Sequence, residues 1–314
     1  MNKYEPCDIT DWPITAPEYG GDDGKTWVGR PELADPSEKS QWWLFKPAKY
    51  GVLTLPGNVP GGRYRRRDDH VEKIVSELAA LIGLPAADVV VAVRNDEEGI
   101  ISRNVAPKGW DLQPGNTYLS EFDGYQNCDV TERPRNRVGH NVANISKLLQ
   151  GKPGPPDTAV AEWEALDVFV GYLILDAWVA NTDRHALNWG ILDSKGVGRL
   201  AKSYDHGSSL ASGASETRLR QILELGVEDW SGKAQAHRFE DGKKKTLLDV
   251  ALEGLQVSSG RAREFVDRIG SLDRASWLGV LEGIPSMSEV AYTFTDELLA
   301  ANRKRLCDGN KRLE

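Results

Sequence analysis

Residues 181–188 read Asn-Thr-Asp-Arg-His-Ala-Leu-Asn, and residues 203–207 read Ser-Tyr-Asp-His-Gly. Asp183 precedes Asn188 by five positions, and Asp205 follows that asparagine by seventeen. A carboxylate, an amide and a second carboxylate in this order can place one acid beside a hydroxyl group and give a magnesium ion two oxygen ligands. These two stretches therefore give the strongest indication of the fold and of the chemistry of the chain.

The residues between the two stretches predict a β-hairpin. Short strands at 189–192 and 199–204 flank a turn of Asp-Ser-Lys-Gly. Because a hairpin brings its two ends to the same edge, we expect Asn188 and Asp205 within reach of one cation. Asp183 is then left to orient a hydroxyl group or accept its proton, with most of the acceleration coming from positioning and charge neutralisation. The pattern predicts a site for phosphoryl transfer.

Phosphoryl transfer also needs a cation that binds the phosphates. Lys46 is the best candidate, because it is a lone lysine at the end of the apolar strand expected at 41–46. A carboxylate on the following helix should hold it in place. Glu72 and Glu77 lie about 140° apart around that helix, so at most one of them faces Lys46. We favour Glu72.

Composition limits the class of protein. A chain of 314 residues can bury a sizeable core, and two lobes are expected. The net charge of −8 makes the surface a poor match for nucleic acid or an anionic membrane. Cys7, Cys128 and Cys307 are widely spaced and odd in number, which indicates free thiols and no zinc site. The N-terminus lacks the apolar core of a signal peptide, and the longest apolar run, 166–180, contains two aspartates and is too short to cross a bilayer. We expect a cytoplasmic protein.

The first 122 residues predict a mainly β domain with one helix. The helix is expected at 69–81, where apolar residues recur at helical spacing before a glycine and a proline. Residues 51–67 are rich in glycine, proline and arginine and predict a loop. Short strands are expected at 26–28, 41–46, 88–93, 99–103 and 117–122.

Residues 123–314 predict a mainly helical domain, so the whole chain is expected to be an α+β protein. The segment 161–179 is apolar almost all round, which is typical of a helix at the centre of a lobe. The last predicted helix has Thr295 as its N-cap. Further helices are expected at 215–225, 245–255, 261–269 and 295–307.

Each candidate residue also has a simpler explanation. Asp183 and Asp205 could hold turns, as Asx residues often do. Lys46 could leave its strand for solvent, and His185 and His206 could be structural hydrogen-bonding residues. The chemical explanation is favoured because a lysine, a helix glutamate, an Asp-x4-Asn and a later aspartate follow one another in the order that phosphoryl transfer requires.

The same stretches resemble a known family. Residues 181–190 and 203–210 are similar to the catalytic and metal-binding motifs of the HipA-like kinases, a bacterial group distantly similar to eukaryotic protein kinases and phosphatidylinositol kinases. The resemblance extends in order over about residues 40–210. The family's lysine strand, N-lobe helix, following strand and hinge resemble residues 43–46, 70–78, 100–103 and 118–123.

The resemblance implies a two-lobed, protein-kinase-like fold with a small, mainly β N-lobe that has one helix and a mainly helical C-lobe. Asp183 is then the catalytic aspartate, and Asn188 and Asp205 are magnesium ligands. Lys46 binds the α- and β-phosphates of ATP, and His185 supports the catalytic loop.

The resemblance also implies an adenine contact and a loop that covers the phosphates. The backbone of Glu121 and Phe122 is expected to meet the adenine ring. The loop that covers the phosphates is either 20–24 or 57–62, since both are glycine-rich. Neither stretch closely matches the serine-containing phosphate loop of HipA.

The expected activity is that of a serine/threonine-type protein kinase, which transfers the γ-phosphoryl group of ATP to a hydroxyl group with Mg²⁺ as cofactor. A protein acceptor is favoured, and a lipid or small-molecule hydroxyl stays open. The resemblance also admits a regulatory, antitoxin-like partner, whereas a membrane partner is not expected and a nucleic acid is disfavoured.

Two other functions compete with this one. A metal-dependent phosphohydrolase could use His185 and His206 in a dinuclear site, although the chain has only five histidines and no motif that bridges two metals. A catalytically weak nucleotide- or RNA-binding protein on the same fold could use the basic, aromatic-containing cluster at 63–67. Such clusters are more often solvated loops, and Asp68 and Asp69 partly neutralise this one.

Overall fold

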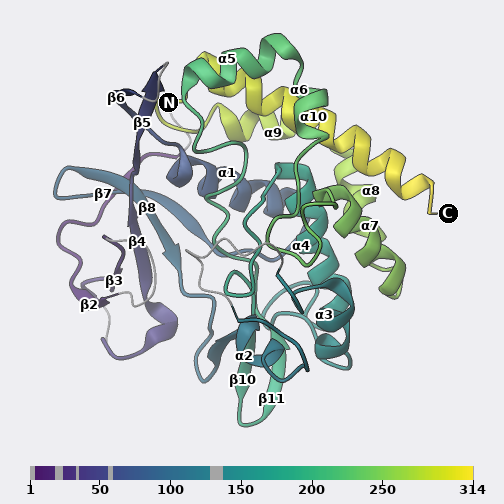
Figure 1. Cartoon of the computed structure of the whole chain (residues 1–314). Helices are drawn as coiled ribbons and strands as arrows, with labels where there is room; N and C mark the ends of the chain where they lie inside the picture. Colours follow the sequence, from purple (N-terminus) through teal and green to yellow (C-terminus); the bar gives the residue numbers. More distant parts are fainter. Residues whose placement is uncertain (1–3, 18–23, 33–34, 56–58, 128–136, 314) are drawn as a thin grey trace.

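A six-stranded sheet dominates the N-terminal region of the computed structural model, which describes residues 4–17, 24–32, 35–55, 59–127 and 137–313 (Figure 1). The strands lie in the order β1-β7-β8-β4-β3-β2, and all neighbours are antiparallel except β1 and β7. Their bounds are Cys7–Asp8 (β1), Ile14–Pro17 (β2), Thr26–Val28 (β3), Trp43–Pro47 (β4), Val89–Arg94 (β7) and Glu97–Arg103 (β8).

The alternation of side chains along β4 determines where its lysine points. Trp43 and Phe45 are buried in a small apolar cluster with Val28 and Ile101 on one face of the sheet. Because side chains alternate between the two faces of a strand, Lys46 points to the opposite face. On that face it meets α1 (Asp68–Leu81).

The helix α1 connects the sheet to the main core of the protein. It has two aspartates in its first turn, where negative charge favours the positive end of the helix dipole. It is followed by Gly83, whose φ of +65° is a conformation that glycine adopts without strain. Its apolar side chains at 71, 74, 75 and 78 belong to the same core cluster as the C-terminal helices.

The prediction of a loop at 51–67 was wrong, because two strands in this range form a second, two-stranded sheet. β5 (Tyr50–Leu55) pairs with β6 (Val59–Arg65). Gly51 lies opposite Tyr64, and a Cβ atom on this glycine would lie 2.5 Å from the tyrosine ring. Gly51, one of the glycines that indicated a loop, therefore permits close packing across the hairpin.

The strand predicted at 117–122 is also wrong. Residues Asp111–Pro114 form β9, and the chain then turns into the short helix α2 (Gly115–Leu119). Pro114 stands at the N-cap with φ of −66°, so it ends the strand and directs the chain into a helical turn. The threonine, tyrosine and leucine that follow indicated a strand, but they lie in the helical turn that begins after Pro114.

The C-terminal region is built around α4 (Ala165–Val179), as the apolar sequence predicted, although the helix begins at Ala165 and not at residue 161. Every residue of α4 except Leu166 is buried. The surrounding helices are α3 (Val142–Leu149), α5 (Glu216–Leu225), α6 (Val227–Ser231), α7 (Leu247–Val257), α8 (Arg263–Ser271), α9 (Arg274–Leu281) and α10 (Glu289–Lys311). Figure 1 shows that α10 runs along the outside of this region to the C-terminus.

These helices differ from the expectations in two respects. The helices α3, α6 and α9 were not predicted. The last helix starts at Glu289 with Ser288 as its N-cap, whose side chain accepts a hydrogen bond from the Ala291 amide. Thr295 is therefore not a cap but a buried residue inside α10.

A small sheet joins the two parts of the chain. Its strands lie in the order β11-β10-β9, where β10 is Gly190–Ser194 and β11 is Val197–Leu200. Because β9 pairs with β10, a strand from the first 122 residues shares a sheet with the C-terminal region. The domain division at residue 122 stays a prediction. None of the helices in the described part of the chain combines the length and the apolar character that a membrane span requires.

Candidate active site

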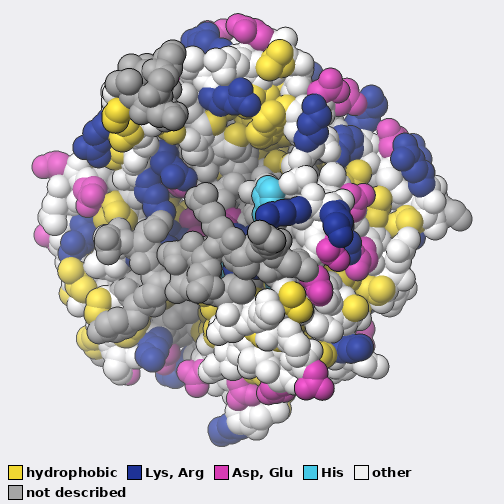
Figure 2. Space-filling model, viewed as in Figure 1, with side chains coloured by type: hydrophobic (Ala, Val, Ile, Leu, Met, Phe, Trp, Pro, Cys, Tyr) yellow, Lys and Arg dark blue, Asp and Glu magenta, His cyan; other side chains and the backbone are white. Residues whose placement is uncertain are grey.

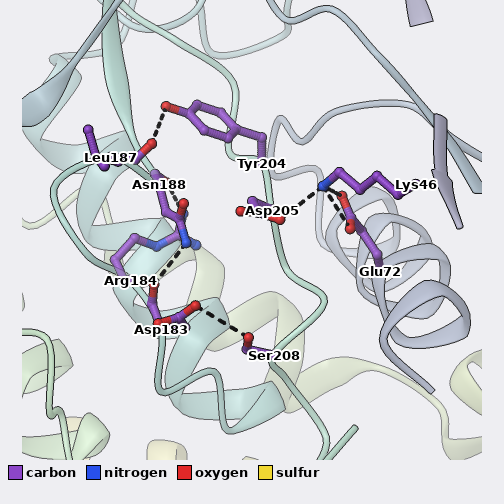
Figure 3. Close-up of polar contacts among 9 residues, drawn as sticks. All are labelled: Lys46, Glu72, Asp183, Arg184, Leu187, Asn188, Tyr204, Asp205 and Ser208. Carbon is purple, nitrogen blue, oxygen red and sulfur yellow. Dashed lines mark hydrogen bonds and ion pairs between the residues drawn. The ribbon is translucent and has the colours of Figure 1, made fainter. Parts of the chain in front are cut away.

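Lys46, Glu72 and Asp205 form one hydrogen-bonded cluster between β4, α1 and the segment after β11 (Figure 3). Lys46 Nζ lies 2.7 Å from Glu72 Oε1 and 2.9 Å from Asp205 Oδ1. The alternative helix carboxylate, Glu77, instead accepts a hydrogen bond from Lys73. The structure therefore pairs Lys46 with the glutamate that the sequence favoured.

The charges of this cluster stabilise one another. Burial alone would lower the pKa of Lys46, but the charges of Asp205 and Glu72 raise it above the ordinary value. The charge of Lys46 is also the main cause that lowers the pKa of Asp205, and Lys25 adds to this effect. Burial raises the pKa of Glu72, and Lys46 opposes the shift. Lys46 thus stays cationic and Asp205 anionic at neutral pH, which suits them to a phosphate and a metal ion.

The β10–β11 hairpin brings the two sequence motifs together as expected. Asn188 lies two residues before β10, and Asp205 lies five residues after β11. The hydroxyl group of Tyr204 donates a 3.0 Å hydrogen bond to the carbonyl oxygen of Leu187 and ties the two stretches to each other. Asp205 itself has φ of +60°, a left-handed conformation that aspartate tolerates better than most residues and that turns the chain directly at the candidate ligand.

A buried ion pair shapes the loop that carries Asp183. Arg184 donates from Nε and Nη2 to the two carboxylate oxygens of Asp176, both at 2.8 Å, and from Nη1 to the carbonyl oxygen of Asn188 at 2.7 Å. Asn181 binds the same aspartate through its side-chain amide and accepts from the Asp183 amide. This pair was not predicted from the sequence, although an aspartate inside the otherwise mostly apolar helix α4 was a usable signal.

The carboxylate of Asp183 contacts two side chains in the described part of the chain. Arg238 Nε lies 2.6 Å from its Oδ1 atom, and Ser208 Oγ lies 3.3 Å from its Oδ2 atom. The side-chain amide of Asn188 donates a 2.9 Å hydrogen bond to the backbone carbonyl oxygen of Asp183. In Figure 3, Asp183, Asn188 and Asp205 surround one space, with the second carboxylate oxygen of Asp205 directed toward Asn188. Arg238 and Ser208 were not among the expected site residues.

The histidines of the motifs hold the local backbone. His185 Nδ1 accepts a hydrogen bond from the Leu187 amide, and His206 Nε2 lies 2.7 Å from Ser203 Oγ. Burial lowers the pKa of both histidines below the ordinary value. These contacts are consistent with the expected supporting role of His185, which stays a prediction.

The side-chain oxygen atoms of Asn188 and Asp205 fit a magnesium ion that is also coordinated by phosphate oxygens. Among the described residues, no group of three or more His, Cys, Asp or Glu side chains could hold a metal ion by itself. One carboxylate, from Asp205, and one amide, from Asn188, are what Mg²⁺ uses when phosphate oxygens and water complete its coordination. This donor set does not match a dinuclear hydrolase site, which needs several protein ligands for each metal.

Contrary to the prediction from the sequence, Glu121 and Phe122 do not end a strand. They follow α2, and their amides donate to the carbonyl oxygens of Tyr118 and Leu119. The segment that leaves the six-stranded sheet directly after β8 is 104–110, and the position of the hinge at 118–123 stays a prediction. The contact of these two amides with adenine stays a prediction, and it would require them to leave their present hydrogen bonds.

The topology separates the two candidate phosphate loops. The stretch 20–24 connects β2 to β3, next to the strand with Lys46, and Gly24 lies against Pro47 of that strand. The stretch 57–62 belongs to the separate β5–β6 hairpin. Residues 18–23 and 56–58 lie outside the described residues, so both loops stay open as predictions.

The basic cluster at 63–67 is mostly engaged in contacts within the protein. Arg65 binds Asp69 and Glu98, and Arg66 binds Asp68. Arg67 donates to two backbone carbonyl groups. Figure 2 shows Lys and Arg side chains interspersed with Asp and Glu over the face in view, instead of one basic field. These observations give no support to an RNA-binding role for the cluster.

Comparisons with known proteins agree with this arrangement at the level of the fold. No protein-family model matches the sequence, and the search of curated proteins also gives no match. The proinflammatory kinase CtkA of Helicobacter pylori superposes with a TM-score of 0.63 at 14% sequence identity, over 98% of each chain. HipA of Shewanella oneidensis MR-1, in a complex with HipB and operator DNA, gives a TM-score of 0.54 at 12% identity, over 84% of this chain and 68% of HipA. The chain therefore has the fold of the HipA-like kinases, with a mainly β N-terminal region and a helical C-terminal part.

Proposed function

We propose that this protein is an ATP- and Mg²⁺-dependent kinase that transfers the γ-phosphoryl group to a hydroxyl group, with serine or threonine of a protein as the favoured acceptor. The observation that carries the proposal is the contact of Lys46 with both Glu72 and Asp205, opposite the loop of Asp183. It brings a fixed cation, the glutamate that holds it and a candidate metal ligand together from three distant parts of the chain. The fold shared with kinases supports it.

Each residue has a role that follows from its contacts. Lys46 would bind phosphate oxygens of ATP, held in place by Glu72. Asn188 and Asp205 would hold Mg²⁺, which supplies neutralisation of the charge on the transferred phosphoryl group. Asp183 would orient the acceptor hydroxyl and accept its proton, with His185 supporting the loop. Arg238, through its contact with Oδ1 of Asp183, would fix the orientation of that carboxylate.

The test is the Asp183→Ala variant. It should bind ATP with nearly the wild-type Kd, because Asp183 does not contact the lysine cluster, and it should lose phosphoryl transfer by about a hundredfold or more. Isothermal titration with MgATP and ³²P transfer into a bacterial lysate measure the two quantities. Asp308→Ala, a change at an exposed position of α10, is the control. Wild-type turnover in Asp183→Ala would refute the assignment.

The acceptor can be identified with the same pair of proteins. A phosphosite survey of lysate treated with wild-type protein and with Asp183→Ala should show serine or threonine sites that depend on Asp183. Enrichment of phosphorylated lipids or small molecules instead would move the proposal to another acceptor class. A regulatory partner and a cytoplasmic location belong to the proposal as well, and HipA in its complex with HipB is the precedent for the partner.

A further inference from the structure

Ser208 already presents a hydroxyl group to the candidate base. Its Oγ atom lies 3.3 Å from Oδ2 of Asp183, and its side chain is exposed (Figure 3). Arg238 Nε lies 2.6 Å from the other carboxylate oxygen of Asp183. Oδ2 is therefore the oxygen that faces a hydroxyl group, and a hydroxyl group of this chain is next to it.

The position of Ser208 is set by the segment that carries the candidate metal ligand. Ser208 follows Asp205 by three residues, and the Ser209 amide donates to the carbonyl oxygen of His206 to close a tight turn. Gly207 passes so close to α1 that a Cβ atom there would lie 3.2 Å from the Asp68 carbonyl oxygen. This packing fixes the turn that presents Ser208 to Asp183.

The neighbouring serines do not share this environment. Ser203, Ser209 and Ser212 are buried, with exposed fractions of 0%, 0% and 2%. Ser203 Oγ lies beside His206, and Ser209 Oγ is enclosed without a hydrogen-bond partner among the described residues. Ser208 is thus the one exposed serine between residues 203 and 212.

We propose that Ser208 is an internal phosphoacceptor of this site, modified by the same molecule in the absence of an external acceptor. The inference rests on the proposed kinase function. Ser208 Oγ would attack the γ-phosphorus atom of ATP, and the new O–P bond forms while the bond from this phosphorus to the β,γ-bridging oxygen breaks. The electron pair leaves with ADP, and the hydroxyl proton passes to Oδ2 of Asp183.

The experiment maps phosphate on the full chain. Wild-type protein, Asp183→Ala, Ser208→Ala and Ser209→Ala are incubated with MgATP, and the modified residues are located by tandem mass spectrometry while ADP formation is followed. Ser209→Ala is the matched control, because it removes the adjacent but buried hydroxyl group. We expect phosphate on Ser208 in the wild type and in Ser209→Ala and none in the other two proteins. The rate per molecule should not change with protein concentration.

The outcomes separate this inference from the proposed function. Wild-type protein that forms ADP or phosphorylates an added protein, but carries no phosphate on Ser208, overturns the inference and leaves the kinase function in place. Phosphate that accumulates faster at higher protein concentration also overturns it, because the acceptor would then lie in another molecule. Absence of ADP formation and of transfer to every acceptor would overturn both proposals.

Discussion

At the scale of single residues, Lys46 is the best-defined feature of the site. It is held by two carboxylates from different parts of the chain, and one of them, Glu72, is only 3% exposed. A buried carboxylate that loses its cation is strongly unfavourable. Lys46 should therefore contribute both to nucleotide binding and to stability.

The Lys46→Met variant tests both contributions. We expect at least about a tenfold increase in the Kd of MgATP, because a charge-assisted contact with phosphate is lost, and a loss of a few kcal/mol, roughly 3, in the free energy of unfolding. Titration calorimetry and urea denaturation measure these values. Lys39→Met, at an exposed position, should leave both unchanged. Equal nucleotide affinity in Lys46→Met and the wild type would assign phosphate binding to another lysine.

A second residue, His140, connects the catalytic loop to Arg238. Trp189 Nε1 can only donate, so its 3.1 Å contact makes Nε2 of His140 an acceptor. The proton is then on Nδ1, which donates to the carbonyl oxygen of Arg238 at 2.6 Å. Burial lowers the pKa of His140 from 6.5 to about 4, so the ring is neutral at physiological pH and both hydrogen bonds are satisfied.

This histidine should make the stability depend on pH. The unfolded chain binds a proton at His140 below pH 6.5, whereas the folded protein does so only near pH 4. The free energy of unfolding should therefore fall as the pH decreases through this window, by up to about 3 kcal/mol from this residue. Urea denaturation at pH 7 and pH 5 should show a smaller loss for His140→Gln than for the wild type. His237→Gln, which changes an exposed histidine, should behave like the wild type, and identical pH dependence in all three proteins would contradict the assignment.

At the scale of elements, Arg67 connects α1 to the segment after Asp205. It is the N-cap residue of α1, and its amide donates to the Ser212 carbonyl oxygen. Its guanidinium group donates to the carbonyl oxygens of Leu210 and Ala211 at 3.3 and 2.9 Å. These two residues both have left-handed backbones, with φ of +50° and +49°, a conformation that costs free energy unless other contacts hold it. Arg67 supplies those contacts.

Removal of this arginine should loosen the segment selectively. In Arg67→Met we expect faster hydrogen exchange of the amides at 206–214 and weaker Mg²⁺-dependent binding of ATP, because the position of Asp205 depends on this segment. Arg66→Met is the control, since the guanidinium group of Arg66 pairs with Asp68 and makes no hydrogen bond to the carbonyl groups of Leu210 and Ala211 that Arg67 binds. Exchange mass spectrometry that shows the same protection in both variants would mean that Arg67 does not hold the segment.

At the scale of the whole molecule, the candidate nucleotide site lies where the sheet, α1 and the C-terminal region meet. A ligand that contacts Lys46 from β4 and Asp205 from the C-terminal region binds only when these parts are correctly packed. It should therefore stabilise the entire fold. The expected gain is about 2.7 kcal/mol when the ligand is present at a hundredfold excess over its Kd.

Thermal unfolding can test the role of the metal in this effect. MgATP should raise the unfolding midpoint of the wild type more than ATP with EDTA does. Asp205→Ala should remove most of the difference between the two conditions, because a magnesium ligand has been lost. An equal effect of Mg²⁺ in the variant and the wild type would count against Asp205 as a metal ligand.

Local patterns in the sequence predicted much of this molecule. The apolar run of α4, the helical spacing of α1 and the turn of the β10–β11 hairpin are properties of neighbouring residues. The order of Lys46, Glu72, Asp183, Asn188 and Asp205 can also be read from the linear chain, where it resembles the order of the motifs of the HipA-like kinases. Errors arose at 51–67 and 117–122, where glycine content and β-forming residues indicated the wrong local structure.

The contacts between distant residues were decided only by the tertiary structure. Arg238 lies 55 positions from Asp183 in the sequence, and no spacing or periodicity indicates that it binds the carboxylate of this candidate base. The same holds for the hydrogen bond of His140 to the Arg238 carbonyl oxygen. It also holds for the hydrogen bonds of Arg67 to the segment that follows Asp205. Such contacts depend on how helices and strands pack against each other, and packing is a property of the assembled core that no short stretch of sequence contains.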